Sequence, residues 1–253
     1  MPIIDSELGQ FARKQLEKNG AQVITGTKVQ KMAKDSEGAV AQLTDGSEIE
    51  ADKVIVSIGR LADLDRLNCQ AAGVQTNQRK VIADKTMRTN VPHIYAIGDV
   101  CDSPYDLAHT AMKEGIVAVE NIIGNVVEMK YEAVPNCVYT HPEIATVGLS
   151  QREAEAQGIA PATGRFNFAG NGKAISMGEA EGYIKIVVDK SSDTIIGAQM
   201  AGPHVTDLIA QMTLAIENKL TVAEVADTIF AHPTLSEALW ESLESVCGVA
   251  IHS

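Results

Sequence analysis

The stretch Ile94-Tyr95-Ala96-Ile97-Gly98-Asp99 is an apolar run that ends on a carboxylate. It follows a turn at Thr89-Asn90-Val91-Pro92, and a second apolar run, Val54-Ile55-Val56-Ser57-Ile58-Gly59, lies upstream of it. Continuous apolar runs of this length predict strands that are buried on both faces, as in a parallel sheet. The two runs therefore predict an α/β region.

The residues around these runs predict a helix and a small antiparallel meander. Asp5 is placed to cap a helix that runs to about Asn19, with Gly20 as its stop. Asp45-Gly46 is a hairpin signal. The expected strands and the next helix in this part of the chain are residues 23–24, 27–34, 40–43, 48–50 and 80–83, and residues 107–123.

From about Tyr131 the pattern changes to strands followed by capped helices. The pairs Ser150/Glu153, Thr221/Glu224 and Thr234/Glu237 have capping-box spacing, in which each side chain bonds an otherwise free amide of the first turn. The pattern predicts an α+β layer with helices on one side of an antiparallel sheet. The expected strands are residues 137–140, 146–149, 165–168, 183–188 and 195–200, and a longer helix covers residues 204–218.

Composition excludes several classes of function. The chain has 253 residues and a formal net charge of −12, which argues against nucleic-acid partners and against docking on an anionic membrane. No stretch reaches the roughly 18 apolar residues of a membrane helix. Met1 to Gln10 carries Asp5 and Glu7 without a basic start or an apolar run, so it does not predict a secretory signal. We expect the cytoplasm, or an organelle matrix if a leader was removed.

The four cysteines are expected to be reduced and mostly packed, because none is spaced as CxxC and none belongs to a metal-ligand cluster. No metal site is predicted. The sequence also contains no GxGxxG and no GxSxG, and the nearest approach to the former is Gly170-Asn171-Gly172. The cysteines are Cys69, Cys101, Cys137 and Cys247.

Asp99 and the helix that follows it form one candidate ligand site. A carboxylate at the carboxyl end of a strand can accept hydrogen bonds from a sugar or polyol hydroxyl. The alternative is that Asp99 only caps the next turn. The helix start at Leu107-Ala108-His109 presents free amides and a positive dipole end that stabilise negative charge on a ligand. His109 alternatively caps that helix or lies on the surface, which its spacing favours.

His232 and Glu237 form a second candidate site. Histidine moves protons near neutral pH, and a nearby carboxylate can orient its ring. In the alternative, Glu237 completes a capping box with Thr234, and Pro233 holds His232 extended. Spacing alone favours this alternative.

Three motifs, in this order, resemble those of the flavin-dependent pyridine nucleotide–disulfide oxidoreductases. Residues 51–60 are similar to the strand that closes that family's NAD domain, residues 89–99 to its second flavin motif, and residues 232–237 to its C-terminal catalytic motif. Three further segments resemble the dihydrolipoyl dehydrogenase branch of the family: Leu107-Ala108-His109, Tyr139-Thr140-His141-Pro142-Glu143 and Asn171-Gly172-Lys173-Ala174. Glutathione reductase is the alternative branch, because it also uses a His-Pro-Thr motif.

The resemblance implies roles for particular residues. Asp99 would bind the ribityl chain of FAD, and Ala108 would offer its amide to the flavin ring. Gly59 and Val29 would line the NAD site. His232 would be the acid/base for dithiol–disulfide exchange at the disulfide of the partner subunit, and Glu237 would orient it. The chain would therefore act in a homodimer.

The resemblance also implies the architecture and the activity. The fold would be an α/β remnant of NAD-binding and FAD-binding Rossmann-like regions, followed by an α+β dimerisation domain with an antiparallel sheet. The expected bounds are 1–61 for the NAD-binding part, 62–130 for the FAD-binding or central part and 131–253 for dimerisation. The reaction would reoxidise dihydrolipoyl groups on acyltransferase subunits of 2-oxoacid dehydrogenase complexes or of the glycine cleavage system.

Two departures from the family pattern qualify these implications. The family usually shows proline and asparagine after Gly59-Arg60, whereas this chain has Leu61-Ala62-Asp63-Leu64-Asp65. The chain also starts after the family's flavin pyrophosphate motif, redox cysteines and NAD glycine motif. We therefore expect a fragment that is inactive and colourless alone, or a catalytically silent dimerisation module. If residues 1–60 do not keep their fold alone, residues 54–58 lose their sheet neighbours and become an exposed apolar edge.

Overall fold

The computed structural model describes residues 4–34 and 38–252. Short 3-10 turns lie at Cys69–Ala72, Gly98–Val100 and Phe168–Gly170. The helices and strands, in chain order, are α1 Ser6–Lys18, β1 Val29–Lys34, β2 Ala39–Leu43, β3 Glu48–Ala51, α2 Leu64–Leu67, α3 Ala108–Ile122, β4 Asn136–Val138, β5 Glu143–Gly148, α4 Gln151–Ala156, β6 Pro161–Asn167, α5 Gly172–Met177, β7 Tyr183–Asp189, β8 Ile195–Gly202, α6 Val205–Glu217, α7 Val222–Ala226 and α8 Glu237–Val246.

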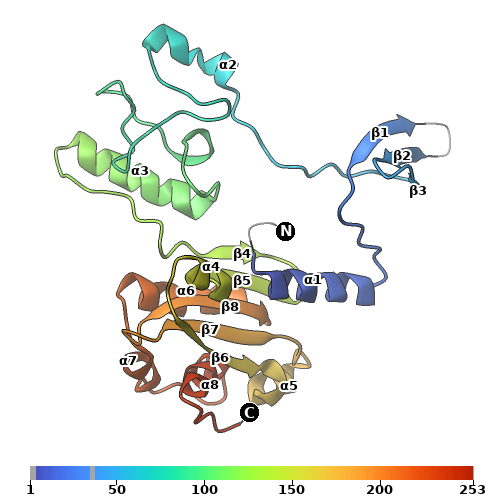
Figure 1. Ribbon diagram of the computed structural model, residues 1–253, viewed down its shortest axis with the longest axis vertical. Coiled ribbons are helices and arrows are strands. Elements are labelled where there is room, and N and C mark those ends of the chain that lie inside the picture. Colours follow the sequence, from blue (N-terminus) through green and yellow to red (C-terminus); the bar gives the residue numbers. More distant parts are fainter. Residues whose placement is uncertain (1–3, 35–37, 253) are drawn as a thin grey trace.

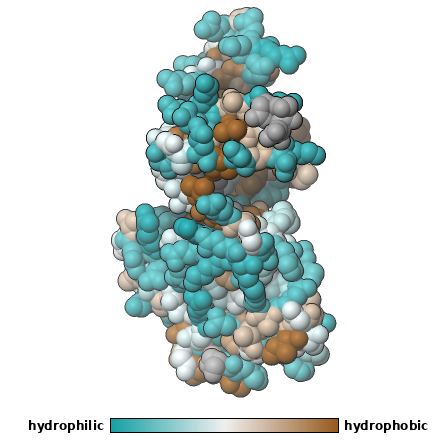
Figure 2. Space-filling view, turned by 90° about the vertical axis from the view of Figure 1, so that its right-hand side faces the viewer, coloured by the Kyte–Doolittle hydropathy of each residue, from teal (hydrophilic) through white to brown (hydrophobic). Residues whose placement is uncertain are grey.

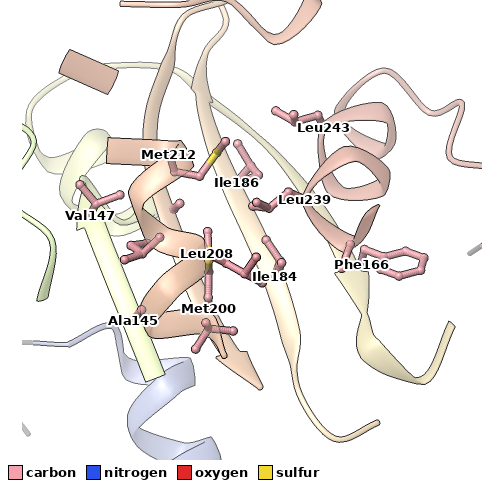
Figure 3. Packing of buried hydrophobic residues seen from close by; sticks show 14 of the residues in the cluster. Ala145, Val147, Phe166, Ile184, Ile186, Met200, Leu208, Met212, Leu239 and Leu243 are labelled. Carbon is pink, nitrogen blue, oxygen red and sulfur yellow. The ribbon is translucent and has the colours of Figure 1, made fainter. Parts of the chain in front are cut away.

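The C-terminal part is a layered α+β body, as predicted. Its sheet has the strand order β4-β5-β8-β7-β6, and every neighbouring pair is antiparallel. Alternate side chains of β5, β7 and β8 point toward α6 and α8, and Figure 3 shows Ile186 beside Met212 and Leu239. Burying these apolar side chains between the sheet and its helices is the main favourable contribution to the stability of this body.

The opposite face of the same sheet is covered in part by α1 (Figure 1). Leu8 and Ala12 pack there against Ile144, Tyr183 and Ala201. The predicted start of this helix is confirmed, because the Asp5 carboxylate accepts from the amide of Glu7 at 2.8 Å. The first helix of the chain therefore contacts a sheet that is formed more than a hundred residues later.

The meander predicted before Gly59 is present as the antiparallel sheet β1-β2-β3. Asp45-Gly46 forms the turn between β2 and β3, where Gly46 has a φ of 87° that favours glycine. The strand expected at residues 23–24 was wrong, since those residues have no partner strand among the described residues.

The prediction of a buried strand at Val54–Ile58 was wrong. These residues have no regular secondary structure, and the side chains of Ile55 and Ile58 are 93% and 92% exposed. A strand needs a hydrogen-bonded neighbour, and no strand in residues 4–34 or 38–252 pairs with this run. The run therefore forms no strand, and its apolar side chains are exposed.

The strands predicted at residues 80–83 and 94–99 were also wrong. They form only isolated bridges, such as Val81 to Cys101 and Arg88 to Tyr95. Val81 also bridges to Thr76, but each of these bridges is a single isolated pair, so no continuous ladder develops. Residues 94–97 lead instead into the 3-10 turn Gly98–Val100.

The predicted helix at residues 107–123 is confirmed as α3, and the later helix at 204–218 as α6. The capping boxes at Ser150 and Thr221 are both complete. The third predicted box was wrong in part. The Thr234 hydroxyl donates to the carbonyl of Ala231 at 2.7 Å, and α8 begins only at Glu237.

The four cysteines are free thiols, and Cys247 is the exposed one. Burial raises the pKa of the Cys101 thiol to about 11, with the Glu114 carboxylate adding to the effect. Within the described ranges, no group of His, Cys, Asp and Glu side chains is arranged to hold a metal ion. None of the helices that the structure describes is both long and apolar enough to cross a membrane.

Candidate active site

The structure brings His232 and Glu237 together. His232 Nδ1 lies 2.8 Å from Glu237 Oε1 across the junction between an irregular loop and the first residue of α8. The His232 side chain is 78% exposed, whereas that of Glu237 is 23% exposed. A carboxylate on a fixed helix end therefore holds a solvent-facing imidazole.

Both oxygens of Glu237 are used. Oε2 accepts from the amide of Thr234 at 2.8 Å, while Oε1 is bonded to the ring of His232. Burial opposes ionisation of Glu237, but the Thr234 amide and the His232 ring outweigh it and lower the pKa of this carboxyl. Glu237 is thus an anion that accepts from the loop backbone and from the imidazole at once.

Asn171 supports the loop and was not predicted as a site residue. This side chain is buried, and its Nδ2 donates to the carbonyl of Thr234 at 3.0 Å. Its Oδ1 accepts from the amide of Ala174 at 2.9 Å, which caps α5. An asparagine just before a helical segment was the signal for the cap, but nothing in the local sequence indicated the bond to Thr234.

Asp99 lies in the 3-10 turn Gly98–Val100, with an exposed side chain that has no hydrogen-bond partner in the described part of the chain. The turn is packed on α3. Gly98 has a φ of 66°, and a side chain there would meet the Ala111 methyl at 3.2 Å. Glycine at this position therefore lets the Asp99 turn approach the first turns of α3.

Glu114 of α3 fixes this turn and was also missed. The side chain is fully buried, and its carboxylate accepts from the Gly98 amide at 2.6 Å and from the Tyr131 hydroxyl at 2.8 Å. Burial, together with the bond to Glu114, raises the pKa of Tyr131. The available signal was an acidic residue on the same helical face as Val117 and Ala118.

Ala108 is the first residue of α3, so its amide belongs to the turn whose N–H groups have no helical acceptor. His109 is exposed, and its Nε2 is 2.8 Å from the carbonyl of Pro135. His109 thus lies on the surface, as in the alternative given above, and its ring connects the start of α3 to the segment that precedes β4.

Gly59 and Val29 do not join either group of residues. Gly59 lies in the irregular segment after β3 with a φ of 106°, and Val29 is the first residue of β1 and is 55% exposed. Figure 1 shows β1–β3, α3 and α8 in three separate parts of the molecule. Within one chain, the acid/base pair and Asp99 therefore lie apart.

Two family models match this chain. The model for "Pyridine nucleotide-disulphide oxidoreductase" matches residues 1–115, and the model for its dimerisation domain matches residues 134–243. Both describe the same family, and together they cover most of the sequence.

Curated proteins named dihydrolipoyl dehydrogenase are similar over the whole chain. The one from Thermus scotoductus is 42% identical over 100% of this chain and 56% of its own length. The one from Rhizobium etli is 40% identical over 100% of this chain and 54% of its own length. The chain thus spans about half the length of the curated relatives it matches.

Two solved structures are also similar to this chain. LpdA from Mycobacterium tuberculosis matches with a TM-score of 0.89 and 26% identity over 95% of this chain and 52% of its own. The HOCl-induced flavoprotein disulfide reductase RclA from Escherichia coli matches with a TM-score of 0.87 at 20% identity, over 96% of this chain and 56% of its own, which supports the fold alone.

Proposed function

This chain belongs to the pyridine nucleotide–disulphide oxidoreductase family, and from that premise we propose that it supplies the acid/base pair, part of the flavin site and the dimerisation domain of an NAD-dependent dihydrolipoyl dehydrogenase. The reaction oxidises a dihydrolipoyl dithiol to the disulfide, and the two electrons released reduce NAD. The 38–42% identity to proteins of that name supports this branch of the family.

The observation that carries the proposal is the 2.8 Å contact between His232 Nδ1 and Glu237 Oε1. An ionised carboxylate can only accept, so Nδ1 donates and the ring lone pair is on Nε2. Nε2 can then take a proton from a substrate thiol and later return one to a leaving thiolate. Because the side chain of His232 is largely exposed, a disulfide on the partner subunit can reach it.

The described residues fit part of a bound flavin. The free, exposed carboxylate of Asp99 would accept from the ribityl hydroxyls of FAD, and the amide of Ala108 at the positive end of α3 would donate to the ring. FAD, when bound, supplies the two-electron relay between thiols and NAD. This chain's own contribution is to orient the cofactor, with Gly98 and Glu114 holding the Asp99 turn.

We also propose that Gly59 and Val29 contact NAD. Gly59 has no side chain to obstruct a ligand, and Val29 is exposed at the start of β1. The segment Leu61–Asp65, which departs from the family pattern, leads into α2, and the Asp63 carboxylate accepts from the amide of Arg66 there. This loop is the part of the NAD site that we expect to differ from the relatives.

Dimerisation and partners follow from the same proposal. We assign residues 131–253 to dimerisation, 62–130 to the FAD-binding part and 1–61 to the NAD-binding part. The complete enzyme would be a cytoplasmic homodimer that accepts lipoyl groups carried by acyltransferase subunits of 2-oxoacid dehydrogenase complexes or the glycine cleavage system. The separation of His232 from Asp99 within one chain supports a site shared between two subunits.

A second candidate function is a catalytically silent dimerisation module. The 253 residues contain no GxGxxG and no closely spaced cysteine pair, and phosphate contacts from such a loop contribute strongly to dinucleotide binding. We therefore expect the isolated chain to be colourless and inactive. A purified chain with a flavin absorbance band would contradict that expectation.

Activity of the protein expressed from the complete reading frame of the gene tests the first function. It is assayed with dihydrolipoamide and NAD, and His232→Gln is expected to lower kcat about 10²–10⁴-fold, the usual contribution of a positioned acid/base. His204→Gln is the matched control and should leave kcat unchanged. Failure with dihydrolipoamide, combined with reduction of glutathione disulfide by NADPH, would assign the glutathione reductase branch instead.

A further inference from the structure

A second carboxylate–imidazole pair lies next to the first on α8. Glu241 is one helical turn after Glu237, and its side chain is only 3% exposed. Its Oε1 is bonded to His252 Nδ1, and its Oε2 accepts from the amide of Ile251 at 2.9 Å. The ring of His252 is 64% exposed. A buried carboxylate thus holds a solvent-facing imidazole here as well.

The two pairs approach α8 from opposite directions along the chain. His232 comes from the loop before the helix, and His252 comes from the segment after it. Side chains four residues apart on a helix are neighbours, so Glu237 and Glu241 lie on one face. The pKa of Glu237 is lowered against the opposing effect of burial, and the charge of His252 is among the causes, after Thr234 and His232. The second imidazole is therefore within electrostatic reach of the first pair.

We propose that Glu241 and His252 are positioning residues that set the charge around His232 and Glu237. Glu241 fixes the second imidazole beside the first pair and balances its charge. Removing either partner changes the net charge next to His232 and Glu237, and the two removals change it in opposite directions. The inference rests on the proposed function, because that function makes His232 the group that moves protons.

Other charged side chains near α8 are engaged elsewhere or form no ion pair with these four residues. Glu224 of α7 bonds to Thr221. Arg165 of β6 and Lys185 of β7 both pair with Glu7 of α1, on the other face of the sheet. The remaining charges on these elements and on α5 are Glu244, Asp189 and Lys173, which make no ion pair in residues 4–34 and 38–252.

A purely mechanical role for the second pair is the competing explanation. The backbone of His252 lies close to Gly170, where an added Cβ would come within 3.0 Å of the His252 carbonyl. Gly170 precedes Asn171, whose side chain bonds to Thr234 in the His232 loop. Loss of either member of the pair would loosen that loop in the same way. A role in setting charge instead predicts effects of opposite sign.

The test follows the titration of the His232 ring by NMR in the full chain, so it requires neither flavin nor turnover. His252→Asn leaves the Glu241 carboxylate uncompensated and should move the His232 titration midpoint to higher pH. Glu241→Gln removes a negative charge one helical turn from Glu237 and should move the midpoint to lower pH. Each displacement should be about 0.4 pH unit, the effect of a unit charge one to two helical turns away in a hydrated setting. Both should shrink in high salt.

His204→Asn is the matched control, because this exposed histidine is at the start of α6 and outside the pair. Opposite displacements that diminish with salt support the proposal. Displacements of the same sign, or none, overturn it in favour of the mechanical role. If Glu241→Gln does not fold, the surface variant His252→Asn decides alone. A midpoint at higher pH that returns toward the parent value in high salt supports the proposal, and an unchanged or lower midpoint overturns it. An inactive complete enzyme with opposite displacements would refute the proposed function and leave the charge coupling intact.

Discussion

The residues before and after about position 130 differ in how they bury apolar side chains. In the C-terminal body, Ile184, Ile186 and Met200 have no exposed surface and pack in one cluster with α6 and α8. In the N-terminal part, Ile55 and Ile58 are almost fully exposed and only small separate clusters form. Figure 2 shows patches of brown surface among the teal of the upper part of the molecule, a mostly teal surface below them, and further brown patches at the lower end.

This difference shows that the C-terminal sheet finds its packing partners among the described residues, with α1 of the N-terminal part included, whereas the run Val54–Ile58 does not. The five-stranded sheet, its covering helices and α1 all belong to this chain. The run Val54–Ile58 has the composition of a buried strand without a neighbouring strand in the described residues. Stability should therefore be concentrated in the C-terminal body.

The largest expected effect tests this concentration directly. Ile186→Ala removes a fully buried side chain from the centre of the main cluster and should lower the free energy of unfolding by about 2–5 kcal/mol. Ile58→Ala is the matched control and should change it by less than about 0.5 kcal/mol, because this side chain is already exposed. Urea denaturation of the chain measures both. Equal losses would mean that the two regions are not packed differently.

A smaller effect should appear at the contact between the two regions. Glu114→Ala leaves the Gly98 amide and the Tyr131 hydroxyl without their acceptor, which should cost about 1–3 kcal/mol. Because burial and Glu114 raise the pKa of Tyr131, that pKa should fall toward the ordinary tyrosine value in the variant. Hydrogen exchange at Gly98 and spectrophotometric titration of the tyrosines check the two expectations.

Glu120→Ala is the control for that experiment, since Glu120 is on the same helix and bonds only to Asn125 among the described side chains. It should leave exchange at Gly98 unchanged. Fast exchange in the control, or normal exchange after Glu114→Ala, would show that the carboxylate does not join the Asp99 turn to Tyr131.

A predicted strand was confirmed only where a neighbouring strand pairs with it among the described residues. Tyr183–Val188 and Val54–Ile58 have similar apolar patterns, and both were predicted as strands. The first pairs with β6 and β8, and the second pairs with no described strand. Apolar pattern gives the tendency of a segment to be buried, whereas the strand itself requires a hydrogen-bonded neighbour. The capping boxes at Ser150 and Thr221 were predicted correctly because their signals are local.

The same distinction holds for the candidate site. His232 and Glu237 are five residues apart, so a sequence motif contains both partners. Asn171 and Thr234 are separated by 63 positions, and the bond between them follows only from the packed fold. Glu114 was missed for a related reason, since its acceptor role depends on the Gly98 turn packing onto α3. The roles of Asp99, Ala108, Gly59 and Val29 remain predictions.

The smallest expected effect concerns the site end of the C-terminal body. The pKa of Glu237 is lowered, with burial opposed by the Thr234 amide and the His232 ring. A carboxyl group whose pKa is lower in the folded state than in the unfolded state stabilises the fold at pH values above its unfolded-state pKa. This contribution is lost as the pH falls through the lower, folded-state pKa. Glu237→Gln should therefore be less stable than the parent chain near pH 6, by under about 1 kcal/mol, and the difference should shrink as the pH falls through the lowered folded-state pKa of Glu237. Glu244→Gln, on the same helix, should follow the parent at every pH. A constant difference between Glu237→Gln and the parent from pH 6 to 3 would mean that the stabilising bonds of Glu237 do not depend on its charge.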